Sequence, residues 1–168
     1  MGSKRTAEGP LSLGYVHGAV SIVRETIEID APPEVVFDTI MDPHRLSEWV
    51  TIHRSVKAPA GQKLEAGARM DQVLHMRGVS FTVHWELESV KRPSAAEWIG
   101  RGPAMSRASI RYRLSGPPEG PTQFEYSNEF HTPGGALGAV ASRVVVGHAS
   151  EREAERTLAK LKQLLEKH

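Results

Sequence analysis

The C-terminal stretch from Gly134 to His168 constrains the fold most strongly, because it is long, free of proline and periodic. Its apolar residues recur at steps of three and four, which places them on one face of a helix. These residues are Leu137, Val140 or Ala141, Val144, Ala154, Leu158, Leu161 and Leu165. A helix of about 30 residues is roughly 45 Å long, enough to cross a small domain.

The two halves of this predicted helix differ in character. The second half carries charges on every face except the apolar stripe, so we expect it to pack on one side only. The first half, Ala136 to His148, is small and apolar nearly all round. It is predicted to be covered on most sides and to form the roof of a cavity, where small side chains leave room.

The residues before the helix alternate between apolar and polar, the period of half-buried strands. The pattern predicts strands at residues 19–30, 51–58, 68–77, 80–90, 96–101, 106–115 and 122–132. Turn-length links join the last six, so these must be antiparallel. Between the first two strands, Pro33 and the pair Asp42-Pro43 carry the start signals of two short helices in tandem.

Bulk composition indicates one globular domain over residues 19–168, after a flexible lead-in at residues 1–18. Lys and Arg total 21 against 20 for Asp and Glu, which gives no electrostatic case for nucleic acid. No apolar run approaches the length of an integral membrane segment, and no secretory signal is recognisable. A cytoplasmic location is therefore expected. Gly2 and Thr6 fit a myristoylation pattern, but a plain disordered start is the favoured interpretation.

The segment ETIEIDAPPEVVFDTIMDPHRLSEWV resembles the opening of the START-like (SRPBCC) proteins, in particular the polyketide cyclase/dehydrase group. The matching positions are Ala31, Pro32, Val35 or Val36, Phe37, Asp42, Pro43 and Trp49. The C-terminal segment from Pro133 is similar to theirs as well. The resemblance implies an α+β helix-grip fold, in which a seven-stranded antiparallel sheet curls round the long C-terminal helix and encloses a cavity.

Polar side chains in the apolar phase of a strand or helix are the candidates for ligand contact, since burying them unpaired costs about 1–3 kcal/mol each. Gln72, Asn128 and Arg54 fall in that phase of their strands, and His148 falls on the helix stripe. With the aromatic and roof residues, the predicted ligand-binding set is Trp49, Arg54, Gln72, Trp85, Tyr112, Asn128, Val140, Val144 and His148.

Each of these residues also has a purely structural interpretation. Arg54 and Glu25 could pair with one another near a rim, while Gln72 and Asn128 could be satisfied by water or backbone. In the simplest interpretation, Trp85 and Tyr112 are aromatic residues of the hydrophobic core. The histidines show no metal-binding spacing on a helix, and there is no nucleotide-binding loop, so neither a metal nor a cofactor is expected.

Two classes of function fit the resemblance. The first is a non-enzymatic carrier or sensor, monomer or homodimer, that holds a hydrophobic or amphipathic small molecule such as a lipid, a polyketide or a quinone-like compound. The second is a polyketide aromatase/cyclase with Arg54 as electrophilic stabiliser and Tyr112 or His148 handling protons. A member that acts on a partner protein, chaperone-like or toxin-like, is a third possibility.

Overall fold

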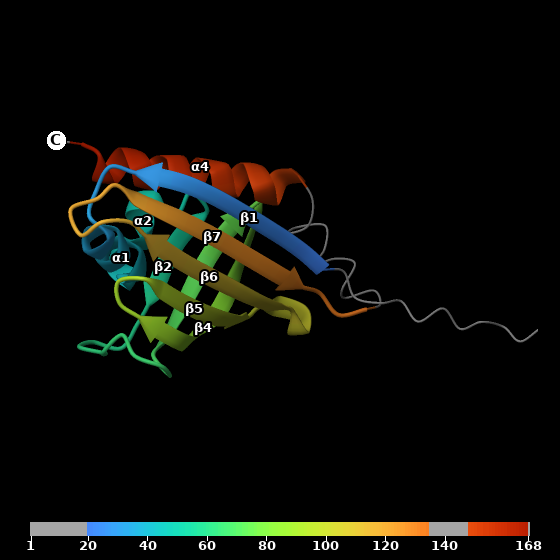
Figure 1. Ribbon diagram of the computed structural model, residues 1–168. Helices are drawn as coiled ribbons and strands as arrows, with labels where there is room; N and C mark the ends of the chain where they lie inside the picture. Colours follow the sequence, from blue (N-terminus) through green and yellow to red (C-terminus); the bar gives the residue numbers. More distant parts are fainter. Residues whose placement is uncertain (1–19, 135–147, 168) are drawn as a thin grey trace, which may run out of the picture.

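The computed structural model describes residues 20–134 and 148–167 and contains one seven-stranded antiparallel sheet (Figure 1). The strands are β1 (Val20–Ile29), β2 (His53–Lys57), β3 (Arg69–Met76), β4 (Val79–Lys91), β5 (Ala95–Arg101), β6 (Arg107–Ser115) and β7 (Thr122–His131). The helical segments are α1 (Pro33–Met41), η1 (Pro43–Arg45), α2 (Leu46–Trp49), η2 (Pro103–Met105) and α4 (His148–Leu165). The predicted antiparallel sheet with a C-terminal helix packed on it is confirmed.

The order of strands in the sheet is β1-β7-β6-β5-β4-β3-β2. Strands β2 to β7 therefore follow one another as hairpins, and only β1 pairs out of sequence, with β7. This places β1 and β2 at opposite edges of the sheet. Buried and exposed residues alternate along most strands, as expected when one face is covered and the other is solvated.

Proline positions explain the two short helical segments between β1 and β2. Pro33 begins α1, where a missing N–H costs nothing, and Pro43 does the same for η1. The Asp42 carboxylate accepts a hydrogen bond from the backbone N–H of His44 at 2.9 Å, which caps η1. The segment ends in α2 with Trp49, whose side chain is only 1% exposed.

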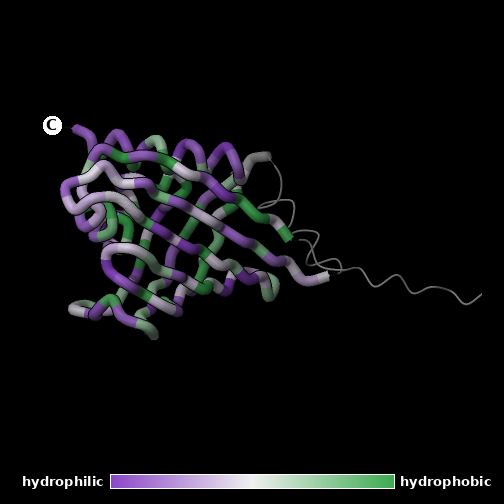
Figure 2. Tube along the Cα trace, viewed as in Figure 1, coloured by the Kyte–Doolittle hydropathy of each residue, from purple (hydrophilic) through white to green (hydrophobic). Residues whose placement is uncertain are grey.

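Helix α4 packs on the sheet near β1 and on α2 (Figure 1). Its buried stripe consists of Ala154, Thr157, Leu158 and Leu161, while its outward side is hydrophilic (Figure 2). The predicted helix was longer, starting at Gly134; its first half, including residues 135–147, lies outside the described residues. The second half is helical as predicted, over 18 residues.

Hydrogen bonds fasten the C-terminal end of α4 to the end of β1. The Lys162 ammonium donates to the backbone carbonyl of Glu28 at 2.6 Å. The backbone N–H of Asp30 donates to the Glu166 carboxylate at 2.8 Å. This end of the helix is therefore held against the sheet, and the opposite end of α4 borders a cavity.

Candidate functional site

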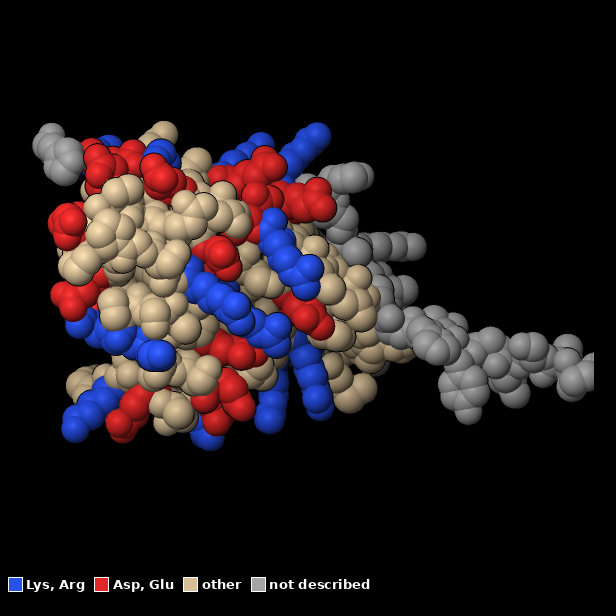
Figure 3. All heavy atoms as spheres, viewed as in Figure 1, with Lys and Arg blue, Asp and Glu red and all other residues tan. Residues whose placement is uncertain are grey.

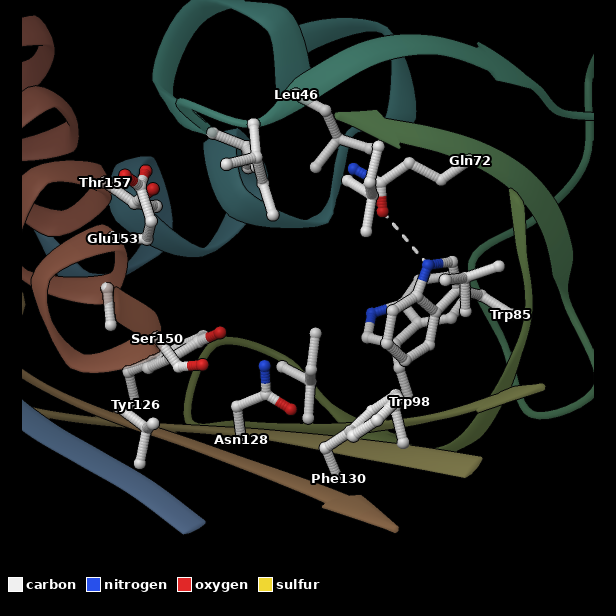
Figure 4. Close-up of a pocket in the computed structure, with 18 of the residues that line it drawn as sticks. Leu46, Gln72, Trp85, Trp98, Tyr126, Asn128, Phe130, Ser150, Glu153 and Thr157 are labelled. Carbon is white, nitrogen blue, oxygen red and sulfur yellow. Dashed lines mark hydrogen bonds between the residues drawn. The ribbon is translucent and has the colours of Figure 1, made fainter. Parts of the chain in front are cut away.

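A cavity of about 130 Å³ lies between the inner face of the sheet, α2 and α4 (Figure 4). Strands β1 and β3 to β7 supply most of its wall, and the helices supply the rest. Most lining side chains are apolar or aromatic, including Leu46, Trp85, Trp98 and Phe130. Such a surface offers affinity for apolar groups but little orientation, which must come from the few polar atoms.

A glycine shapes the aromatic part of the wall. Gly100 on β5 lies directly across from Trp85 on β4. A Cβ atom at residue 100 would lie 2.6 Å from Cζ3 of Trp85, closer than any real contact allows. The absence of a side chain at Gly100 therefore lets the Trp85 ring lie across β5 beside the cavity.

Three side chains form a hydrogen-bonded chain through the wall. The indole N–H of Trp85 donates to the Gln72 amide oxygen at 3.0 Å (Figure 4). This orients the Gln72 amide so that its Nε2 donates to Nδ1 of His53, also at 3.0 Å. His53 is therefore an acceptor at Nδ1, so the neutral ring carries its proton on Nε2. Burial lowers the pKa of His53, which favours this neutral form.

Two phenols and an amide form the floor of the cavity. The rings of Tyr112 and Tyr126 are stacked with centroids 6.1 Å apart. Burial raises the pKa of Tyr112 far above its ordinary value, and the neighbouring Tyr126 adds to the effect. Burial raises the pKa of Tyr126 to about 12, partly offset by hydrogen bonding from Asn128. Both phenols remain protonated at neutral pH and can donate hydrogen bonds.

Two buried side-chain atoms lack a protein partner, and both belong to residues of the cavity wall. They are the amide oxygen of Asn128 and the indole nitrogen of Trp49. Over residues 20–134 and 148–167, no other buried side-chain nitrogen or oxygen is left unpaired. Since such atoms are nearly always hydrogen-bonded in folded proteins, the two stand out among the polar atoms of the wall.

The helix side of the cavity is polar and is tied to the turn before β2. Ser150, Glu153 and Thr157 of α4 line this side (Figure 4). The hydroxyl of Thr51 donates to the Glu153 carboxylate at 2.8 Å, and its backbone N–H donates to the Thr157 hydroxyl at 3.2 Å. These contacts fix the position of α4 relative to α2.

Five of the nine sequence-predicted residues line the cavity: Trp49, Gln72, Trp85, Tyr112 and Asn128. Their contact with a ligand remains a prediction. Val140 and Val144 lie outside the described residues. His148 is the first residue of α4, but its side chain lies outside what the structure describes.

The prediction that Arg54 points into the cavity is wrong. The register of β2 against β3 shifts between His53 and Ser55, a β-bulge that changes which residues face inward. Arg54 is therefore exposed and does not line the cavity, whereas His53 reaches Gln72. The alternative pairing of Arg54 with Glu25 is not formed either, because their strands lie at opposite edges of the sheet.

Sequence reasoning missed His53, Glu153 and Thr157 as wall or support residues. The bulge that brings His53 inward has no signal in the sequence. Glu153 is one of the charged residues that the pattern places outside the apolar stripe, although it lies four residues before Thr157 and therefore on the same side of the helix. That spacing beside the apolar stripe was the one available signal.

A second depression, of about 440 Å³, lies between α1 and the loop that follows β2. Arg92 lines this depression, and its guanidinium group already donates to both carboxylate oxygens of Asp38, at 2.8 and 2.9 Å. This pairing lowers the pKa of Asp38 and leaves the depression without a cation that could hold a ligand. The cavity under α4 is therefore the candidate site.

A family model described as "Polyketide cyclase / dehydrase and lipid transport" matches residues 21–166. The chain belongs to this family. This family and this fold suggest a small-molecule binding or polyketide cyclase-like protein. Within the described residues, no helix is long and apolar enough to cross a membrane, and no group of three or more metal-binding side chains is present.

Solved structures share the fold at low sequence identity. The Zhui aromatase/cyclase of Streptomyces sp. R1128 is 13% identical, with a TM-score of 0.70 over 88% of this chain and 94% of that one. A ginseng major latex-like protein is 7% identical, with a TM-score of 0.67 over 87% and 97%. A START superfamily protein of Mycobacterium smegmatis is 16% identical, with a TM-score of 0.58 over 86% and 94%.

Among curated proteins, a Mycobacterium tuberculosis protein named as a toxin is 26% identical over 77 residues, in two strains. The match covers 46% of this chain and 54% of the toxin. The chain thus spans about half the length of the curated relatives it matches.

Proposed function

We propose that this protein binds a hydrophobic or amphipathic small molecule in the cavity between the sheet and α4. The observation that carries the proposal is the wall itself, which is apolar and aromatic except for a few polar atoms. Ligand sites of this kind take affinity from apolar burial and orientation from sparse hydrogen bonds. Membership in a cyclase and lipid-transport family supports the same assignment.

Native mass spectrometry of the protein purified from its own host tests this proposal. We expect a co-purified small molecule, released by denaturation and identified by its mass. A thermal-shift panel of lipids, polyketides and quinones serves as the second measurement, because a ligand that binds only the folded state raises its melting temperature. Finding neither a bound molecule nor a shift would count decisively against a carrier.

Catalysis as an aromatase/cyclase is the second candidate, and the protonated phenols beside Asn128 favour it. A buried phenol that donates to a ketone oxygen would polarise that carbonyl during ring closure. Tyr112 is the residue we assign to this role, in place of the outward-facing Arg54. In an assay with a poly-ketone chain, Tyr112→Phe should lower turnover at least tenfold and Arg54→Ala should not. The opposite pattern would exclude this mechanism.

A further inference from the structure

We propose that the cavity selects an uncharged ring compound that donates a hydrogen bond to Asn128 and accepts one from Trp49. This inference rests on the proposed function, because it specifies the ligand of the same cavity. It starts from the two buried side-chain atoms without a protein partner, the Asn128 oxygen and the Trp49 indole nitrogen. One can only accept a hydrogen bond and the other can only donate one.

The two atoms come from different elements of the cavity wall. Asn128 belongs to β7, and its amide points into the cavity from the floor (Figure 4). Trp49 belongs to α2, on the helical side. Trp85, another of the three lining indoles, already donates its N–H to Gln72. Among the described residues, the Trp49 indole nitrogen and the Asn128 oxygen are therefore the buried donor and the buried acceptor that no protein group satisfies.

The charge of the wall argues for a neutral ligand. Among the described lining residues there is no lysine, arginine or histidine, and Glu153 carries the one carboxylate. A carboxylate or phosphate group on the ligand would lose its hydration without meeting a cation, and it would also be repelled by Glu153. Fatty acids and phosphorylated lipids are therefore disfavoured relative to uncharged compounds.

The shape and chemistry of the wall argue for rings. Trp85, Trp98, Tyr112 and Phe130 all contribute to it, and planar aromatic surfaces pack well against other rings. The volume enclosed is modest, about 130 Å³. Small bicyclic molecules are accordingly suitable probes.

Four bicyclic probes that differ only in these two groups test the inference on the full chain. Tetralin has neither group, tetralone has the acceptor, tetrahydronaphthol has the hydroxyl, and hydroxytetralone has both. We expect each group to strengthen binding about 2- to 10-fold in tryptophan-fluorescence titrations, the range of one net hydrogen bond. Naphthoate, the anionic probe, should bind at least tenfold more weakly than hydroxytetralone.

Two substitutions assign the groups to their partners. Asn128→Leu should abolish the advantage of the hydroxyl and leave that of the ketone, whereas Trp49→Phe should do the reverse. Ser127→Ala, on the same strand but the next residue, is the matched control and should change neither advantage. If a substitution prevents folding, the four probes compared on the unaltered protein still decide the question.

The outcomes separate this inference from the proposed function. Equal binding of all four probes, or tight binding of naphthoate, overturns the inference while the cavity remains a ligand site. An advantage of the hydroxyl that survives Asn128→Leu overturns the assignment of Asn128. If none of the probes binds and the hydrophobic panel produces no thermal shift, both proposals fail together.

Discussion

Gln72 is a polar residue of the cavity wall, and an apolar side chain of the same shape could not make its hydrogen bonds. Only 5% exposed, it accepts from Trp85 and donates to His53, so both ends of its amide are used. The orientation of the Trp85 ring beside the cavity depends on this contact. A buried amide with every group paired orders its surroundings, whereas a partly paired one destabilises them.

Replacing Gln72 with leucine should therefore lower the free energy of unfolding by about 1–3 kcal/mol, since it leaves the Trp85 N–H and His53 Nδ1 without hydrogen-bond partners. Urea unfolding monitored by fluorescence measures the change. Gln123→Leu, on the exposed face of β7, is the control and should stay within about 0.5 kcal/mol of the unaltered protein. Equal effects at the two positions would mean that the buried network contributes nothing to stability.

His53 should make stability depend on pH. Because burial lowers its pKa from the usual 6.5, the unfolded chain binds more protons than the folded one just below that pH. Its contribution is therefore complete above pH 6.5 and is lost as the pH falls towards the folded-state pKa. His53→Asn keeps an acceptor for Gln72 but cannot titrate, so its melting temperature should fall less between pH 7.5 and pH 5. Parallel curves for the two proteins would contradict this.

Residue-scale prediction from the sequence succeeded where the strand is regular and failed where it is not. Gln72 and Asn128 lie on unbroken strands, so strict alternation was enough to place them in the wall. Arg54 lies at the bulge, where one extra residue reverses the phase. The hydrogen-bond partners of these residues could not be predicted from the sequence, since His53 and Gln72 come into contact only when two strands pair.

At the scale of elements, α4 is held to the rest of the molecule by specific hydrogen bonds at its C-terminal end and at its middle. Towards its C-terminus, Lys162 and Glu166 bind the end of β1. At its middle, Thr157 accepts from the Thr51 backbone N–H, and the two hydroxyls lie 2.9 Å apart. The second attachment borders the cavity, so it controls how closely α4 covers the ligand site.

Thr157→Val keeps the shape of this side chain but removes its hydrogen bonds. We expect a loss of about 1–2 kcal/mol in unfolding free energy and faster amide exchange in the turns of α4 around Thr157. Exchange at the C-terminal end, held by Lys162, should change less. Thr26→Val, on the exposed face of β1, is the control. Uniform acceleration along the whole helix would show that Thr157 does not act locally.

Element positions were predictable because each start and stop has a local chemical cause. Pro33 and Pro43 begin their helices, and the proline-glycine turn at residues 116–121 separates β6 from β7. Periodicity then distinguished strand from helix. The packing between elements was not readable in the same way, because the contact of Thr51 with Thr157 joins residues 106 positions apart.

At the scale of the whole molecule, the inner face of the sheet has two parts that differ in how they are filled. Leu87, Phe124 and Leu161 are at most 1% exposed and do not line the cavity. Around Ala108, Asn128 and Phe130, the inner face borders the cavity instead. Charges of both signs are interspersed on the outer surface shown in Figure 3, so no strong field of one sign directs a ligand to this face.

Enlarging one alanine in each part distinguishes a real cavity from a closed core. Ala96 and Ala108 are both buried, at 4% and 8% exposure, but only Ala108 lines the cavity. Ala96→Leu should overpack the core and cost about 1–3 kcal/mol. Ala108→Leu should cost less than Ala96→Leu, because its added carbons enter space that no side chain fills.

Binding should respond in the reverse order to stability. Ala108→Leu is expected to weaken binding of hydroxytetralone at least tenfold, while Ala96→Leu should leave the affinity of whatever fraction is folded nearly unchanged. Calorimetric melting and fluorescence titration on the two variants provide the comparison. If both substitutions cost the same stability and neither affects binding, the inner face is packed throughout in solution, and the ligand site must lie elsewhere on the molecule.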